Sequence, residues 1–96
     1  MLAFTLRELS LADLPAVLEV YRQCEDFLAL GPVATASEQM VRIDMEHAER
    51  EGSRFCGIYN DAGDMMGIVD YLPQGFAGVP QHAFLELLMI AAPYRQ

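Results

Sequence analysis

The sequence predicts an α+β domain in which a mainly antiparallel sheet lies beside two helices, in the order β-α-α-β-β-β. Three observations support this prediction. Alternating apolar and polar residues near the N-terminus and an apolar run near the C-terminus indicate strands. Two segments repeat apolar residues at the three- and four-residue spacing of amphipathic helices. The length of 96 residues suits one small domain, so we expect a single domain over residues 1–96.

The first strand and the first helix follow each other directly. Residues 3–9, AFTLREL, alternate apolar and polar side chains, as is typical of a strand. Ser10 and Asp13 form a weak capping box, which predicts the start of a helix. Pro15 then falls in the first turn, where its missing N–H costs least, and the helix should end before the Gly-Pro pair at residues 31–32.

The remaining elements are a helix, a hairpin and a last strand. The sequence TASE predicts that Thr35 caps the second helix, and Gly52 is well placed to end it. Residues 54–59 and 65–72 read as two strands joined by the turn residues NDAGD. A loop rich in Pro and Gly then leads to a last strand at about residues 82–91.

The composition excludes several classes of partner. Fourteen acidic residues stand against six arginines and no lysine, a net charge of −8. Nucleic acid and anionic membranes both require clustered basic residues, so we expect neither as a partner. The chain has no apolar run long enough to span a membrane and no signal-peptide pattern, which predicts a cytoplasmic protein. Cys24 and Cys56 should be reduced and partly buried.

Three carboxylates are candidates for a functional site. Glu86 interrupts an apolar strand, where alternation places it on one face with Leu88 and Ile90. Desolvation would raise its pKa and suit it to be a general base near neutral pH; the alternative is an edge-strand charge that faces solvent. Glu25 and Asp26 end the first helix. They either bind a cationic substrate group or form a solvated helix end. Neither histidine has zinc-ligand spacing to a cysteine, so no metal is expected.

The element order and the ending LLMIAAPYRQ resemble the GNAT superfamily of acetyl-CoA-dependent N-acetyltransferases. The family signature is a fourth strand that reads roughly L-x-V-x-P-x-Y-R, followed by a loop R/Q-x-x-G-x-G/A that opens a helix. Pro93 departs from the family's usual proline position. The residues that match are Leu88, Met89 and Ile90 for the L-x-V segment, and Tyr94 and Arg95 for Y-R.

The resemblance implies a site for acetyl-CoA as co-substrate and for an amine acceptor, which would be a small molecule or a peptide. The backbone of residues 88–90 would hold the pantetheine arm, while Arg95 and Gln96 would begin the loop that binds the pyrophosphate. Glu86 would act as the general base, directly or through water, as the amine attacks the thioester carbonyl.

The resemblance covers only the N-terminal half of that fold, and the chain stops at the start of the pyrophosphate loop. We therefore expect the 96-residue chain to bind acetyl-CoA weakly or not at all and to be inactive alone. The open edge of the last strand predicts a homodimer. The alternative function is a non-catalytic half-domain that associates with itself or with a partner.

Overall fold

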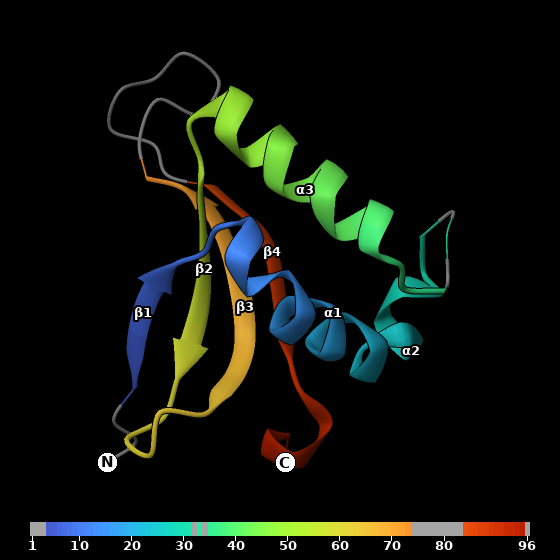
Figure 1. The fold of residues 1–96 in the computed structure, drawn as a ribbon. Coiled ribbons are helices and arrows are strands. Elements are labelled where there is room, and N and C mark those ends of the chain that lie inside the picture. Colours follow the sequence, from blue (N-terminus) through green and yellow to red (C-terminus); the bar gives the residue numbers. More distant parts are fainter. Residues whose placement is uncertain (1–3, 32, 34, 74–83, 96) are drawn as a thin grey trace.

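The computed structural model describes residues 4–31, 33, 35–73 and 84–95. The α+β class is confirmed: an antiparallel sheet of four strands packs against helices that lie on one of its faces (Figure 1). The elements in chain order are β1 (Thr5–Glu8), η1 (Leu11–Asp13), α1 (Leu14–Gln23), α2 (Glu25–Leu28), α3 (Glu38–Glu51), β2 (Arg54–Tyr59), β3 (Met65–Leu72), β4 (Phe84–Ile90) and η3 (Ala92–Tyr94).

The strands lie in the sheet in the order β1-β2-β3-β4, and each is antiparallel to its neighbours. The predicted hairpin is confirmed, because β2 and β3 are joined by a tight turn in which the Asn60 side chain accepts a hydrogen bond from the Asp64 N–H at 2.9 Å. Gly63 has a φ of 87°, a left-handed conformation that favours glycine. Within the described residues, β1 and β4 are the two edges of the sheet.

The first predicted helix is divided into three elements, so the prediction of two helices is wrong. The capping box of Ser10 and Asp13 does form, but it caps η1, and α1 begins only at Leu14. At Cys24 the backbone leaves the helical conformation, with φ −113° and ψ 22°, and α2 follows. Cys24 is buried and its thiol contacts the carbonyl of Ile90 at 3.4 Å, so a tertiary contact marks the break.

The ends of the later elements also differ in part from the prediction. Ser37, not Thr35, caps α3, because its extended backbone lets its hydroxyl accept a hydrogen bond from the Met40 N–H at 3.2 Å. Gly52 ends α3 in the left-handed conformation, as predicted. The last strand ends at Ile90, and the predicted start at residues 82–83 lies outside the described residues.

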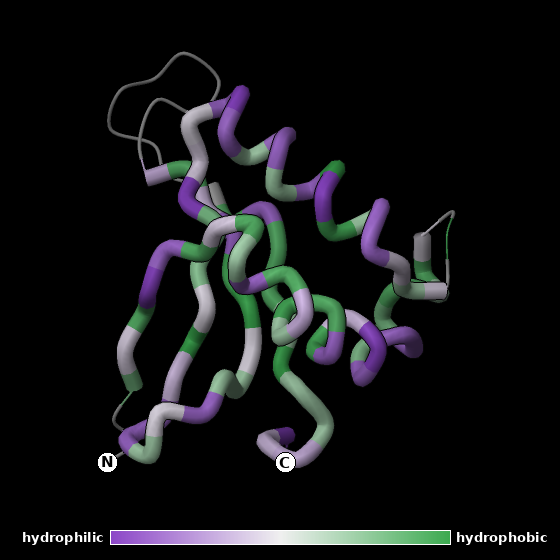
Figure 2. The backbone as a smooth tube through the Cα atoms, in the orientation of Figure 1, coloured by the Kyte–Doolittle hydropathy of each residue, from purple (hydrophilic) through white to green (hydrophobic). Residues whose placement is uncertain are grey.

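The core lies between the helices and the sheet. Figure 2 shows hydrophobic stretches along α1 and the strands, whereas α3 is largely hydrophilic. α3 contributes Val41 and Ala48 to the core, where they meet side chains such as Val17, Tyr21 and Ile68. Both cysteines are free and buried. Within the described ranges, none of the helices has the combined length and apolar character that a membrane crossing requires.

Candidate functional site

Glu86 lies at an irregularity in the pairing of β3 with β4. Asp70 is opposite Leu87, but the next residue, Tyr71, is opposite Leu85, so Glu86 has no partner of its own on β3. An extra residue of this kind forms a β-bulge, which breaks the strict alternation of side chains between the two faces. Glu86 and Leu87 therefore line the same cavity.

The bulge corrects the face predicted for Glu86. Alternation alone would group Glu86 with Leu88 and Ile90. In the structure it is grouped with Leu87, which packs against the core between the helices and the sheet. Leu88, in contrast, is exposed. Glu86 is thus half-buried on the side of the sheet that carries the helices.

The cavity has a volume of about 350 Å³ and lies between α3 and the strands β3 and β4. Its lining combines three carboxylates with one imidazole and one apolar side chain. The α3 residues lie three positions apart, so their side chains project on the same side of the helix. The lining residues are Asp44 and His47 from α3, Asp70 from β3, and Glu86 and Leu87 from β4. We call this space the acidic cavity.

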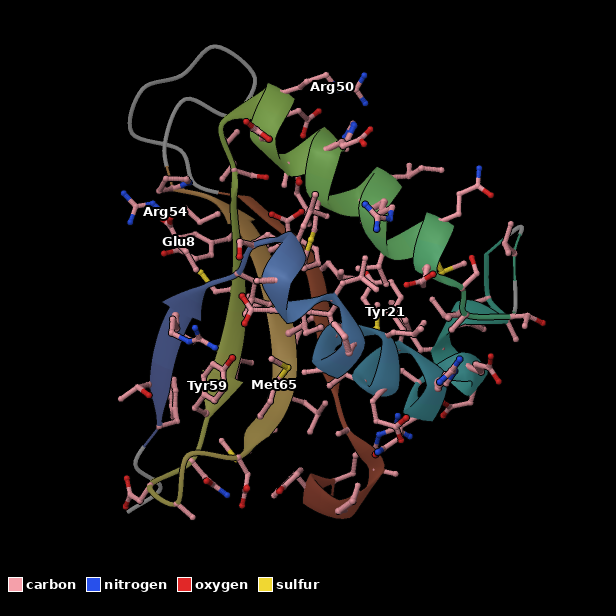
Figure 3. All side chains as sticks on the ribbon, in the orientation of Figure 1. Glu8, Tyr21, Arg50, Arg54, Tyr59 and Met65 are labelled. Atoms are coloured by element: carbon pink, nitrogen blue, oxygen red, sulfur yellow. The ribbon has the colours of Figure 1, made fainter. Side chains whose placement is uncertain are left out.

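Two partly buried hydroxyl contacts hold carboxylates of the acidic cavity in place. The Tyr21 hydroxyl donates a hydrogen bond to Asp44 Oδ2 at 2.6 Å, and Figure 3 shows Tyr21 between α1 and α3. The Ser53 hydroxyl donates to Asp70 Oδ1 at 2.8 Å. Tyr21 is fully buried and Asp70 is only 5% exposed, whereas Asp44 and Ser53 are partly exposed, so both contacts are partly shielded from water. A hydrogen bond to an ionised acceptor is stronger than one between neutral groups.

The crowding of carboxylates changes their proton affinity. Burial raises the pKa of Glu86 to about 7, and the neighbouring Glu51 and Asp70 carboxylates raise it as well. The pKa of Asp44 is also raised by burial and by Asp70, although the hydrogen bond from Tyr21 and the nearby His47 oppose this change. Near neutral pH, Glu86 is therefore present in comparable amounts with and without its proton, which is the state that suits a general base.

The two other predicted carboxylates lie elsewhere and have contacts within the chain. Glu25 Oε2 accepts a hydrogen bond from the Ala36 N–H at 2.8 Å, which ties α2 to the segment that precedes α3. Asp26 forms an ion pair with Arg95 at 3.2 Å. Neither carboxylate lines the acidic cavity with Glu86.

Arg95 connects the end of the described chain to the first helices. Its guanidinium donates to the Gln23 carbonyl at 2.8 Å and approaches the Cys24 sulfur at 3.2 Å, and its Nε donates to the Ile90 carbonyl at 2.7 Å. In this arrangement Arg95 fixes η3 against α1 and α2. Gln96, the other residue predicted for the pyrophosphate loop, lies outside the described residues.

The residues predicted to hold pantetheine lie on β4, whose outer edge has no strand partner within the described residues. Only part of their backbone faces that edge. The Met89 carbonyl lies against Gly67 of β3, and the Ile90 carbonyl accepts hydrogen bonds from Arg95 and Cys24. Of the three residues, Leu88 thus fits an edge-bound ligand best, and the fit of acetyl-CoA to this arrangement is only partial.

Sequence reasoning missed Asp44 and Asp70, although each leaves a trace in the sequence. Asp70 interrupts the apolar strand MMGIVDYL in the same way as Glu86 interrupts its own strand. Asp44 lies three residues after Val41 and four before Ala48, at the margin of the apolar stripe of α3. The described part of the chain contains no group of His, Cys, Asp and Glu side chains suited to a metal ion.

No protein-family model matches this chain, and comparisons with curated proteins and with solved structures find no match. A half-buried carboxylate that titrates near neutral pH stands beside two further carboxylates fixed by hydroxyl groups. Such an arrangement can attract a cation and can accept a proton from it.

Proposed function

We propose that this chain forms the amine-binding side of an acetyl-CoA-dependent N-acetyltransferase, with Glu86 as the general base. The observation that carries the proposal is the position of Glu86, half-buried at a bulge in the edge strand β4 and within an acidic cavity. The order of strands and helices and the sequence after β4 support the same class of enzyme, because both resemble the GNAT superfamily.

An amine acceptor suits the charge of the cavity. Alkyl amines are protonated at neutral pH, with pKa values near that of a lysine side chain, about 10. The carboxylates of Asp44, Asp70 and Glu86 would attract such a cation. The amine must then lose a proton before its lone pair can form a bond to carbon, and Glu86 accepts that proton.

The other residues of the cavity support this step. Tyr21 and Ser53 hold Asp44 and Asp70, so the negative field that attracts the cation stays in place while Glu86 changes its charge. Acetyl-CoA, when bound, supplies the acetyl group as a thioester. The outer edge of β4 at Leu88 is the part of this chain that fits its pantetheine arm.

The test is an acetyl-transfer assay with acetyl-CoA and a panel of primary amines, followed through the release of free thiol. Glu86→Gln should lower kcat by roughly 10²–10⁴-fold, the range for a lost general base, and should remove the limb of the pH–rate profile near pH 7. Glu46→Gln makes the same chemical change on an exposed part of α3 and should leave the rate unchanged. Because the 96-residue chain is expected to bind acetyl-CoA weakly and to be inactive under ordinary conditions, the assay uses a high concentration of acetyl-CoA. If no amine is acetylated even then, or if Glu86→Gln leaves the profile unaltered, the proposal is refuted.

A second candidate function is self-association without catalysis, and the outer edge of β4 favours it. Leu85 and Leu88 are about half exposed on β4. Backbone groups that have no strand partner within the described part of the chain, beside exposed apolar side chains, can pair with the same strand of a second copy around a two-fold axis. Sedimentation equilibrium at tens of micromolar should then show a dimer, and Leu88→Lys should shift it to monomer. A well-folded wild-type monomer would exclude this function.

A further inference from the structure

A second, larger cavity of about 640 Å³ lies beside the N-terminal half of α3. It runs between α3 on one side and α2 with the segment after it on the other. Most of its lining is apolar, and the lining residues include Phe27, Leu30, Val33, Met40, Ile43 and Asp44. We call this space the α2–α3 groove.

Four apolar side chains of the groove are exposed to solvent. Phe27 is 44% exposed, Leu30 84%, and Val33 and Ile43 lie between these values. Single exposed apolar residues are common on protein surfaces, but four that surround one groove indicate a binding site. They lie on a chain with a net charge of −8, so the groove is an apolar patch on a strongly acidic protein.

Asp44 joins the α2–α3 groove to the acidic cavity, because it lines both. Met40, Ile43, Asp44 and His47 follow one another at spacings of three, one and three residues along one side of α3. The lining therefore changes from apolar to charged within one helical turn, about 5.4 Å along the axis. The hydrogen bond from Tyr21 fixes the Asp44 carboxylate at this junction.

We propose that the ligand of this site is an amphipathic amine, with its ammonium group at Asp44 and Glu86 and its apolar tail in the α2–α3 groove. Charge complementarity determines the head group, since three carboxylates line the acidic cavity. The apolar lining of the groove determines the tail. As an assignment of the acceptor class, this inference rests on the proposed acetyl transfer; as a binding site, it rests on the cavities alone.

The first test compares four probes by NMR titration of the 96-residue chain at pH 7. Hexylamine has both the ammonium head group and the apolar tail, whereas ethylamine has the head group with only a short tail. Hexanol has the tail without a charge, and hexanoate has the tail with the opposite charge. Burial of a methylene group strengthens binding by about fourfold, so hexylamine should bind at least tenfold more tightly than ethylamine. Hexanol and hexanoate should both bind more weakly than hexylamine. Equal affinities for hexylamine and ethylamine, or for hexylamine and hexanoate, would overturn the proposal.

Three variants separate the two halves of the site. Ile43→Ser should weaken the binding of hexylamine at least fivefold and leave ethylamine unchanged, because Ile43 lines only the groove. Asp44→Asn should weaken both amines, and its amide oxygen can still accept the hydrogen bond from Tyr21. Leu11→Ser is the control, since Leu11 is exposed outside the groove. An equal effect of Ile43→Ser and Leu11→Ser on hexylamine binding would overturn the assignment of the groove.

The binding test is independent of catalysis, so the two proposals can fail separately. If hexylamine binds but is not acetylated even at a high concentration of acetyl-CoA, the ligand class stands and the proposed function falls. If short and long amines are acetylated with equal kcat/KM, the function stands and the preference for an amphipathic amine falls.

Discussion

Replacement of Tyr21 by phenylalanine removes one hydroxyl group and leaves the buried ring in place. The ring is fully buried, so its apolar contacts remain, and the main loss is the 2.6 Å hydrogen bond to Asp44. A hydrogen bond to a charged acceptor contributes about 1.5–3 kcal/mol. We expect the free energy of unfolding to fall by about 2 kcal/mol, which for a domain of this size lowers Tm by roughly 8–16 °C.

Urea denaturation at pH 7 measures this loss of unfolding free energy directly. The slope of the unfolding free energy against urea concentration should not change. Tyr59→Phe is the matched control, because the Tyr59 hydroxyl accepts a hydrogen bond from the exposed Arg7 at 2.7 Å. We expect this variant to lose less than about 1 kcal/mol, in line with the small contribution of exposed contacts. If Tyr21→Phe lowers the free energy of unfolding by less than about 0.5 kcal/mol, or by no more than Tyr59→Phe does, the Tyr21–Asp44 contact does not hold the site together.

The remaining predictions concern pH and backbone packing. Burial and neighbouring carboxylates raise the pKa of Glu86 from 4.5 to about 7, so the folded protein binds more protons than the unfolded chain in this range, and Glu86 reduces stability as the pH rises through it. Thermal melts from pH 4.5 to 8 should show that Tm falls less with rising pH for Glu86→Gln than for wild type. Parallel curves of Tm against pH for the two proteins would contradict this prediction. Gly67→Ala should cost about 1–3 kcal/mol or more in urea denaturation, because a Cβ there would collide with the Met89 carbonyl. In Gly52→Ala the new Cβ meets no atom within 4 Å, and only the φ of 77° disfavours alanine. We therefore expect the free energy of unfolding to fall by about 1 kcal/mol. A larger loss for Gly52→Ala than for Gly67→Ala would contradict the collision at Gly67.

The parts of the fold that depend on local rules could be predicted from the sequence. Pro15 lies in the first turn of α1, Gly52 ends α3, and the Asn60–Asp64 segment forms the hairpin turn. The break at Cys24 could not be predicted, because it depends on a contact with Ile90 at the other end of the chain. Periodicity describes one helix at a time and contains no information about such contacts.

In the candidate site, too, features that follow from local sequence could be predicted, whereas features that depend on long-range contacts could not. Apolar neighbours in the sequence left two alternatives for Glu86, a desolvated carboxylate with a raised pKa or an edge-strand charge that faces solvent, and the structure agrees with the first. The face on which Glu86 lies was predicted wrongly, since a bulge changes the alternation and leaves no signal in a single sequence. Asp70 lies beside Glu86 because β3 pairs with β4, and Asp44 lines the same cavity because α3 lies against these strands; both arrangements join segments that are distant in the sequence.

The order of strands in the sheet has a consequence for how the chain folds. β2, β3 and β4 follow one another as neighbours, whereas β1 meets β2 only after the chain has passed through all three helices. The hairpin of β2 and β3 closes a short loop and can form early, while the pairing of Leu6 with Ile58 must wait for a long closure. All four β1 residues are exposed, so this strand gains little from burial once it has docked. We therefore expect β1 to join the sheet last and to detach first, with amide hydrogens that exchange with solvent faster than those of β2.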